Sequence, residues 1–190
     1  IFILANAGVD NYDLPSLSST SKIKEIEFYF GIDSLTNHSD PAAYPVGHPL
    51  GFQDPEMNWG WSAGYRFIAY EGVFDYDKNN DPERGFEYHM VADGYFTKLT
   101  LPVNEIVDGA GKKVISINFN ADKLCQSLKF SQKAILHGAG APCDVIHNNI
   151  KTGLVFTPNL TNSTTDLFQP NILRVRQTLT HQKVEILYDF

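Results

Sequence analysis

The segment from Met57 to Gly72 has the sequence MNWGWSAGYRFIAYEG. Its first residues place a thioether and two indoles at every second position. Side chains two residues apart point to the same face of an extended segment, so we expect Met57, Trp59 and Trp61 to share one face. A thioether beside two indoles forms a soft, oxidisable pocket of the kind that suits Cu(I). Large aromatic side chains most often pack in protein cores, so the alternative interpretation is a β-sandwich corner filled by tryptophan.

His89 is the histidine that we expect to lie nearest to this segment. Residues 65–74 and 86–96 have strand character and are joined by residues 75–85, which predicts a β-hairpin. In an antiparallel pair, His89 would lie near Tyr65 and the preceding tryptophan segment, and it would share its face with Glu87 and Val91. His89 is therefore interpreted either as a metal ligand or as a strand residue with satisfied hydrogen bonds.

Oxygen ligands alternate in the predicted hairpin connection, DYDKNNDPERG, at residues 75–85. Asp75, Asp77, Asn79 and Asp81 have the spacing with which calcium loops present their oxygens. The glycine at the sixth position and the glutamate at the twelfth are missing. The loop is either a calcium site or a solvated hairpin tip.

The longest recognisable pattern extends from Gly31 to Val91. Its matching residues are Phe30, Gly31, Ile32, Asp33, Ser34, Asp54, Pro55, Met57, Trp59, Trp61, Gly64, Tyr65, Glu71, Gly72, Phe86, Tyr88 and His89, with a fainter continuation at Ile146, Asn148, Asn149, Ile150 and Phe156. This pattern resembles the MbnP-like family of bacterial extracytoplasmic proteins, which is related to the copper-binding MopE and CorA proteins of methane-oxidising bacteria.

The resemblance implies a copper site that contains His89 and a second histidine, either His48 or His38, beside Met57. Both of the latter histidines belong to the long irregular segment 33–55, and a loop of this length is often functional. Neutral imidazole and thioether ligands favour Cu(I), although zinc competes for histidine.

A modified tryptophan is also implied by the resemblance. In the related copper proteins one tryptophan is oxidised to kynurenine, and in methanobactin-associated members a di-haem enzyme of the cytochrome peroxidase type performs the oxidation. By position, Trp59 is the first candidate and Trp61 the second, and Tyr65 is expected to line the same pocket. Where some relatives place a histidine close to the modified tryptophan, this chain has tryptophan and aspartate.

The elements that must position these residues are mainly strands. Alternation of apolar residues from Lys22 to Ile32 predicts a half-buried strand. Besides the hairpin, we expect strands at 96–101, 114–120, 134–136, 154–156, 173–180 and 184–190, and short helices at 122–130 and 142–151. The prediction is an all-β, mostly antiparallel β-sandwich with one or two short helices in its connections, forming a single domain over residues 1–190.

Composition narrows the cellular setting and the partners. The chain of 190 residues has a formal net charge of −7 and shows no basic patch, which argues against nucleic acid as a partner. We expect no transmembrane segment, because no apolar run is long enough. The chain begins at Ile1 without methionine, so we expect a signal peptide and further strands upstream, where a lipid anchor would also fit. The setting is then periplasmic, cell-surface or secreted.

The two cysteines have two possible states. Cys125 and Cys143 are compatible with one disulfide or with two thiols.

No hydrolase elbow, Walker loop, dinucleotide fingerprint or helical metalloprotease pair occurs, so we expect a protein that is not an enzyme. The alternative to copper binding is a surface binding or adhesion module, in which Trp59, Trp61, Tyr65 and Tyr70 form an aromatic platform without a metal.

Overall fold

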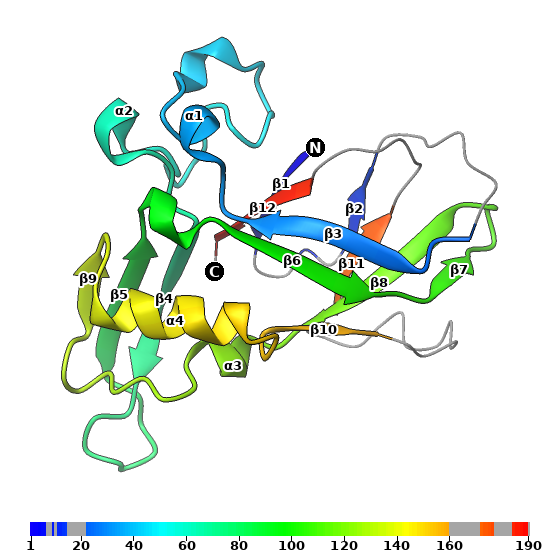
Figure 1. Ribbon diagram of the computed structural model, residues 1–190. Helices are drawn as coiled ribbons and strands as arrows, with labels where there is room; N and C mark the ends of the chain where they lie inside the picture. Colours follow the sequence, from blue (N-terminus) through cyan, green and yellow to red (C-terminus); the bar gives the residue numbers. More distant parts are fainter. Residues whose placement is uncertain (7–8, 10, 15–21, 160–171, 177–183, 190) are drawn as a thin grey trace.

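The alternation around Ile26 forms the strand β3, Glu25–Phe30, in the computed structural model of the chain (Figure 1). The structure describes residues 1–6, 9, 11–14, 22–159, 172–176 and 184–189. In β3 the side chains of Ile26, Phe28 and Phe30 are buried while Glu25 and Glu27 are exposed, which confirms the predicted half-buried strand.

Two sheets contain the described strands. The larger sheet has the order β6 (Thr97–Pro102), β3, β12 (Val184–Asp189), β4 (Ile68–Phe74), β5 (Arg84–Met90) and β9 (Ile135–His137), and β1 (Phe2–Asn6) also pairs with β12. The smaller sheet has the order β10 (Phe156–Pro158), β8 (Lys113–Phe119), β11 (Ile172–Arg176) and β2 (Asn11–Asp13), and β7 (Glu105–Val107) also pairs with β8. Residues 177–180 and 190, which belong to the last two predicted strands, lie outside the described residues.

The predicted all-β class is confirmed, and the sheets are mixed. Antiparallel pairs include β4 with β5, β3 with β6 and β8 with β11. Parallel pairs join β12 to β1, β3 and β4, β11 to β2, and β5 to β9. The parallel pairs connect segments that are far apart in sequence or separated by other elements, so local alternation could not reveal them.

Helices are short in the described chain. They are α1 (Ser34–Asn37), α2 (Gly60–Ala63), α3 (Ala121–Leu124) and α4 (Ala141–Lys151), with 3₁₀ turns η1 (Pro41–Ala43) and η2 (Asp93–Tyr95). The α4 helix confirms the second predicted helix, whereas α3 is shorter than expected. Among the helices searched in the described residues, none has the length and apolar character needed to span a bilayer.

The hydrophobic core draws side chains from both sheets and from α4. Phe28 of the larger sheet meets Phe156 of the smaller one edge-on, with ring centroids 5.3 Å apart. The α4 helix packs against β5 and buries Cys143, Ile146 and Ile150 (Figure 1). Cys125 and Cys143 are free thiols in the structure, and burial raises the pKa of Cys143 to about 12, so its thiol stays protonated.

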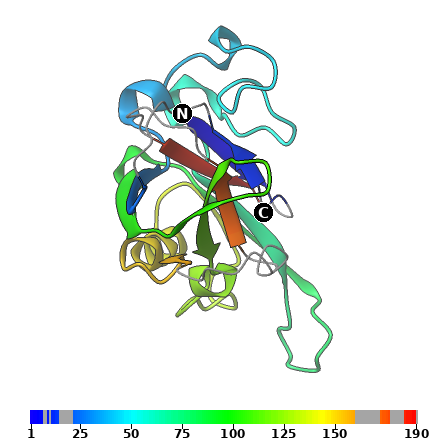
Figure 2. The same cartoon turned by 90° about the vertical axis from the view of Figure 1, so that its right-hand side faces the viewer.

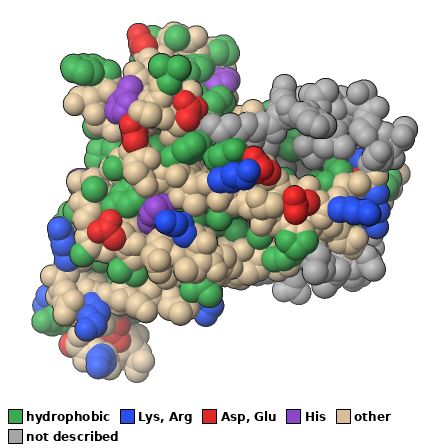
Figure 3. Space-filling view, in the orientation of Figure 1, with side chains coloured by type: hydrophobic (Ala, Val, Ile, Leu, Met, Phe, Trp, Pro, Cys, Tyr) green, Lys and Arg blue, Asp and Glu red, His purple; other side chains and the backbone are tan. Residues whose placement is uncertain are grey.

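The β4–β5 hairpin and the edge strand β9 form the framework of the candidate site. Ala69 of β4 faces His89 of β5 in the ladder, which confirms the predicted hairpin, and His89 faces His137 of β9. The tip of the hairpin projects from the body of the protein (Figure 2). On the face shown in Figure 3, acidic and basic side chains of the described residues are interspersed, and no continuous basic patch forms.

Candidate metal centre

The tryptophan segment is not extended, so the prediction of one shared face is wrong. Gly60 has a φ of +84° and begins the helix α2, and Gly64, with a φ of +81°, ends it. The side chain of Met57 is buried in the core, while Trp59 is 36% exposed and Trp61 is 81% exposed, so the two indoles do not fill a buried corner of the sandwich. The turn at Gly60 therefore separates the two indoles.

The Trp59 ring lies over two histidines. Its centroid is 5.3 Å from that of His89 and 5.4 Å from that of His137, and the Arg66 guanidinium lies 5.5 Å from the indole centroid. The backbone N–H of Trp59 donates to the Gly64 carbonyl at 2.9 Å, so the chain closes a tight turn around α2 directly after the Trp59 ring. Trp59, not Trp61, is thus the tryptophan beside the histidines.

His89 and His137 stack against each other. Their ring centroids are 4.4 Å apart and their planes differ by 12°, because the two residues face each other on the adjacent parallel strands β5 and β9. His89 is buried, whereas the side chain of His137 is partly exposed. The pair thus has one histidine in the protein interior and one at the surface.

The hydrogen bonds of His89 define its protonation. Nε2 lies 2.5 Å from Glu71 Oε1, and because a carboxylate can only accept, Nε2–H is the donor. Burial lowers the pKa of His89, and the charges of Arg66 and His137 lower it further, against the opposing effect of Glu71. His89 is therefore neutral near pH 7, and its Nδ1 carries a lone pair that is buried and has no hydrogen-bond partner among the described residues.

A carboxylate completes the group. His137 Nε2 lies 3.1 Å from Glu87 Oε2, and Glu87, His89 and His137 can each present one ligand atom, all within 4.8 Å of one another. Two imidazoles and a carboxylate suit first-row transition metals, and imidazole is a good ligand for copper and zinc. The unpartnered lone pair of His89 and this set of donors fit a copper ion.

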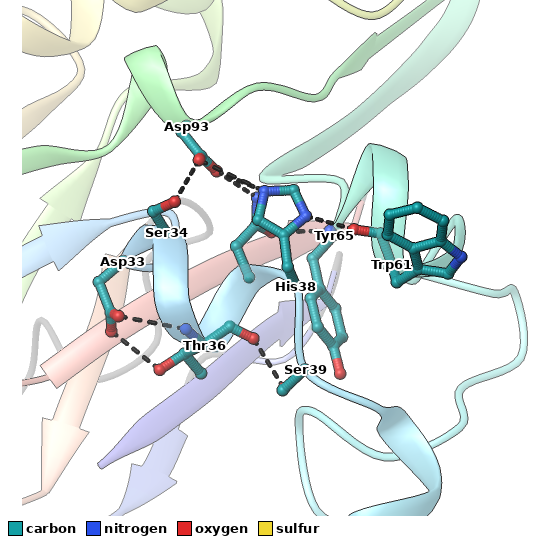
Figure 4. A network of polar contacts seen from close by, with 9 residues as sticks. Asp33, Ser34, Thr36, His38, Ser39, Trp61, Tyr65 and Asp93 are labelled. Atoms are coloured by element: carbon teal, nitrogen blue, oxygen red, sulfur yellow. Dashed lines mark hydrogen bonds and ion pairs between the residues drawn. The ribbon is translucent and has the colours of Figure 1, made fainter.

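His48 and His38 are not members of the group formed by Glu87, His89 and His137. His48 stacks on Tyr44 at 4.7 Å and its Nδ1 accepts the Leu50 N–H at 3.1 Å. His38 Nδ1 donates to the Trp61 carbonyl at 2.5 Å, and its Nε2 lies 3.3 Å from Asp93 (Figure 4). Neither histidine belongs to the group of possible ligands around His89, in which the second histidine is His137.

Asp93 of η2 binds side chains of the segment that carries α1 (Figure 4). Its carboxylate accepts from Ser34, from Asn37 Nδ2 at 2.7 Å and from His38. Burial alone would raise the pKa of Asp93, but hydrogen bonds from these three side chains lower it below its ordinary value of 3.8. The Asp93 carboxyl therefore binds a proton more weakly in the folded state than in the unfolded chain.

We expect Asp93→Asn to lower the melting temperature near pH 7 by removing the ionised acceptor. A depressed carboxyl pKa stabilises the fold above pH 3.8, and this contribution disappears as the pH falls through the lower, folded-state pKa. The difference in melting temperature between wild type and variant should accordingly shrink below pH 3.8. Thermal unfolding at a series of pH values checks this, and a difference that is constant down to pH 3 would contradict it.

The predicted calcium loop is closed by its own side chains. Asp75 accepts the N–H groups of Asn79 at 3.1 Å and Asn80 at 2.7 Å, Asp77 accepts from Asn79, and Asn79 accepts the Asp81 N–H at 2.7 Å. Ligand oxygens of Asp75, Asp77 and Glu83 lie within 4.8 Å of one another, a group of acidic residues that does not include Asp81. Calcium binding stays a prediction, and the observed contacts are those of a hairpin tip.

Sequence reasoning missed His137 and Arg66 as site residues. Glu87 shares the strand face of His89, so alternation could have signalled it. His137 directly follows the predicted strand 134–136, but its parallel pairing with β5 has no local signature. The signal that could have found it is the strand itself, which ends on a histidine.

Comparison with known proteins identifies a family. The model of a family described as MbnP matches residues 7–144, which is more than half of the chain. The match includes the tryptophan segment, both strands of the hairpin and β9, and hence every member of the candidate metal group. No curated protein and no solved structure matches the chain.

Proposed function

The chain belongs to the MbnP family, and on this premise we propose that it is an extracytoplasmic copper-binding protein that holds Cu(I) at Glu87, His89 and His137. The observation that carries the proposal is the stacked pair of histidines in which the buried Nδ1 of His89 lacks a partner. We place the protein in the periplasm or at the cell surface, and we propose that it handles copper and does not catalyse a reaction.

A carboxylate outside the ligand group would orient His89. A histidine that binds a metal through one ring nitrogen commonly donates the other N–H to a carboxylate, which fixes the tautomer. Glu71 does this for His89, whose Nε2 lies beside its carboxylate. A neutral imidazole ring held in this way can bind a metal without first losing a proton.

Trp59 is the tryptophan that we propose is converted to kynurenine. Its ring lies against both histidines and is partly exposed, so a di-haem partner enzyme of the peroxidase type could reach it. With two equivalents of hydrogen peroxide as the oxidant, the indole C2–C3 bond would be cleaved with gain of two oxygens and release of two waters, which opens the ring to a formamide. Hydrolysis of the formamide would then release the lost carbon as formate. The new amine and carbonyl would then lie next to the candidate metal group.

The structure gives less support to the aromatic platform. Tyr65 is fully buried, its hydroxyl donates to the Leu50 carbonyl at 2.5 Å, and burial raises its pKa to about 12. Tyr70 is half-buried and its hydroxyl lies 2.6 Å from Cys125 Sγ. Only Trp61 offers a largely exposed ring, so the four rings do not make one surface.

Peptide mapping of protein purified from its native host should find the modification on Trp59. We expect the peptide containing residues 57–66 to carry the mass change of tryptophan conversion to kynurenine, and copper to copurify with the protein. Trp59→Phe should abolish the mass change because it removes the ring beside the histidines.

Trp61→Phe is the matched control, since it changes an indole two residues away that points into solvent. The mass change should persist in this variant. Copper bound to protein with unmodified tryptophans would remove the kynurenine step and keep the copper site. A protein that remains free of copper after loading with Cu(I) would contradict the proposed function.

A further inference from the structure

Arg66 places a buried positive charge beside the candidate metal group. Its side chain is only 5% exposed, and Nη1 lies 3.5 Å from His89 Nε2. Nη2 donates to the Glu56 carbonyl, and the guanidinium packs on the Trp59 ring. Nε is buried and has no hydrogen-bond partner among the described residues. Arginine remains charged at any physiological pH, so the site permanently contains this cation.

The charges around the histidines balance for one positive ion. Glu71 and Glu87 each contribute a carboxylate and Arg66 offsets one of them, while an imidazole that binds a metal through a ring-nitrogen lone pair is neutral. A monovalent cation therefore brings the local charge to zero. A divalent cation leaves an excess positive charge in a partly buried site, where charges interact more strongly than in water.

We propose that Arg66 is a specificity determinant that makes this site prefer a soft monovalent cation, Cu(I), over divalent cations such as Zn²⁺. The inference rests on the proposed function, because it concerns the same three ligands. Imidazole and carboxylate by themselves bind zinc and Cu(II) well, so these ligands do not explain a preference for Cu(I). Repulsion by Arg66 doubles when the bound charge doubles, which opposes the divalent ions selectively.

The test compares the affinities for Cu(I) and Zn²⁺ in wild type and in Arg66→Gln, each measured by competition with a chromophoric chelator. We expect the variant to bind Zn²⁺ more tightly relative to Cu(I), with the ratio of the two affinities shifted at least about tenfold. A merely structural role of Arg66 would weaken both metals by similar factors and leave the ratio unchanged. Arg66→Lys keeps the charge and should preserve most of the wild-type ratio.

Arg84→Gln is the matched control. Arg84 also packs on an aromatic ring, that of Tyr76, with 3.5 Å between guanidinium and ring centroid, and its loss changes the net charge equally. It lies at the start of β5, toward the hairpin tip, and is exposed, so its removal should not shift the ratio. A shift as large as that of Arg66→Gln would reduce the effect to one of overall charge and overturn the inference.

Glu71→Gln supplies an independent test with the opposite sign. A glutamine oxygen can still accept from His89, but the site loses a negative charge, so the preference for Cu(I) over Zn²⁺ should increase. If wild type binds neither metal at these residues, the proposed function itself fails. If wild type binds Cu(I) and the ratio moves in none of the Arg66 and Glu71 variants, only the role of Arg66 is overturned.

Discussion

His89→Ala is expected to weaken Cu(I) binding at least about tenfold, because it removes the ligand whose ring is buried, neutral and held by Glu71. His137→Ala should produce a loss of similar size, since His137 faces His89 in the ladder and stacks on it. A competition titration with a Cu(I)-specific chelator measures both losses on the same scale. Similar losses for the two variants would indicate that the histidines act on one ion.

His48→Ala and His38→Ala are the controls that separate the structure-based site from the one suggested by sequence. Each of these histidines has its own partners, Tyr44 and the Leu50 N–H for His48, and Asp93 and the Trp61 carbonyl for His38. Their removal should leave the Cu(I) affinity nearly unchanged. A loss in either control that equals the loss in His89→Ala, with His137→Ala unaffected, would return the second ligand to the irregular segment.

Gly64→Ala is expected to lower the free energy of unfolding by about 3 kcal/mol or more. Gly64 has a φ of +81° and a ψ of −158°, a conformation that is essentially restricted to glycine. A Cβ at this position would lie 2.5 Å from Asn37 Nδ2. Asn37 is fully buried and connects the Tyr65 N–H to Asp93, so its displacement breaks two hydrogen bonds in addition to straining the backbone. Denaturant unfolding measures the loss.

Gly60→Ala provides the comparison for this loss. Gly60 has nearly the same φ, +84°, but a Cβ there would meet nothing within 4 Å. Only backbone strain remains, so the expected destabilisation is about 1 to 2 kcal/mol. If both variants lose the same stability, the contact between Gly64 and Asn37 does not contribute as argued.

The sequence predicted the strands more reliably than it predicted the site. Alternation is a local signal, and it located β3, β4, the start of β5 and β8 within a few residues, although the predicted strand 86–96 continues past the end of β5 into η2. Residues of the hairpin could be placed near each other because an antiparallel connection follows from adjacency in the chain. The position of His89 near the tryptophan segment therefore follows from the strand pattern alone.

The second histidine could not be predicted for a physical reason. β9 reaches β5 through a parallel pairing that joins residues 48 positions apart at His89 and His137, and parallel pairs require crossover connections that leave no mark on the strand itself. The prediction that Met57, Trp59 and Trp61 share one face failed for a different reason. Gly60 adopts a positive φ and turns the chain into α2, and the alternation of Met57, Trp59 and Trp61 is the same whether or not glycine bends the segment.

The edge position of β9 makes metal binding a form of ligand-linked folding. This strand has three residues and ends the larger sheet, so few backbone hydrogen bonds hold it to β5. An ion shared by His89 and His137 would add a cross-link between neighbouring strands that the unfolded chain cannot make. Saturation with copper would then stabilise the outer border of the sheet, and release of the ion would loosen it. The occupied and empty forms would thus present different edges to a partner that delivers or removes the metal.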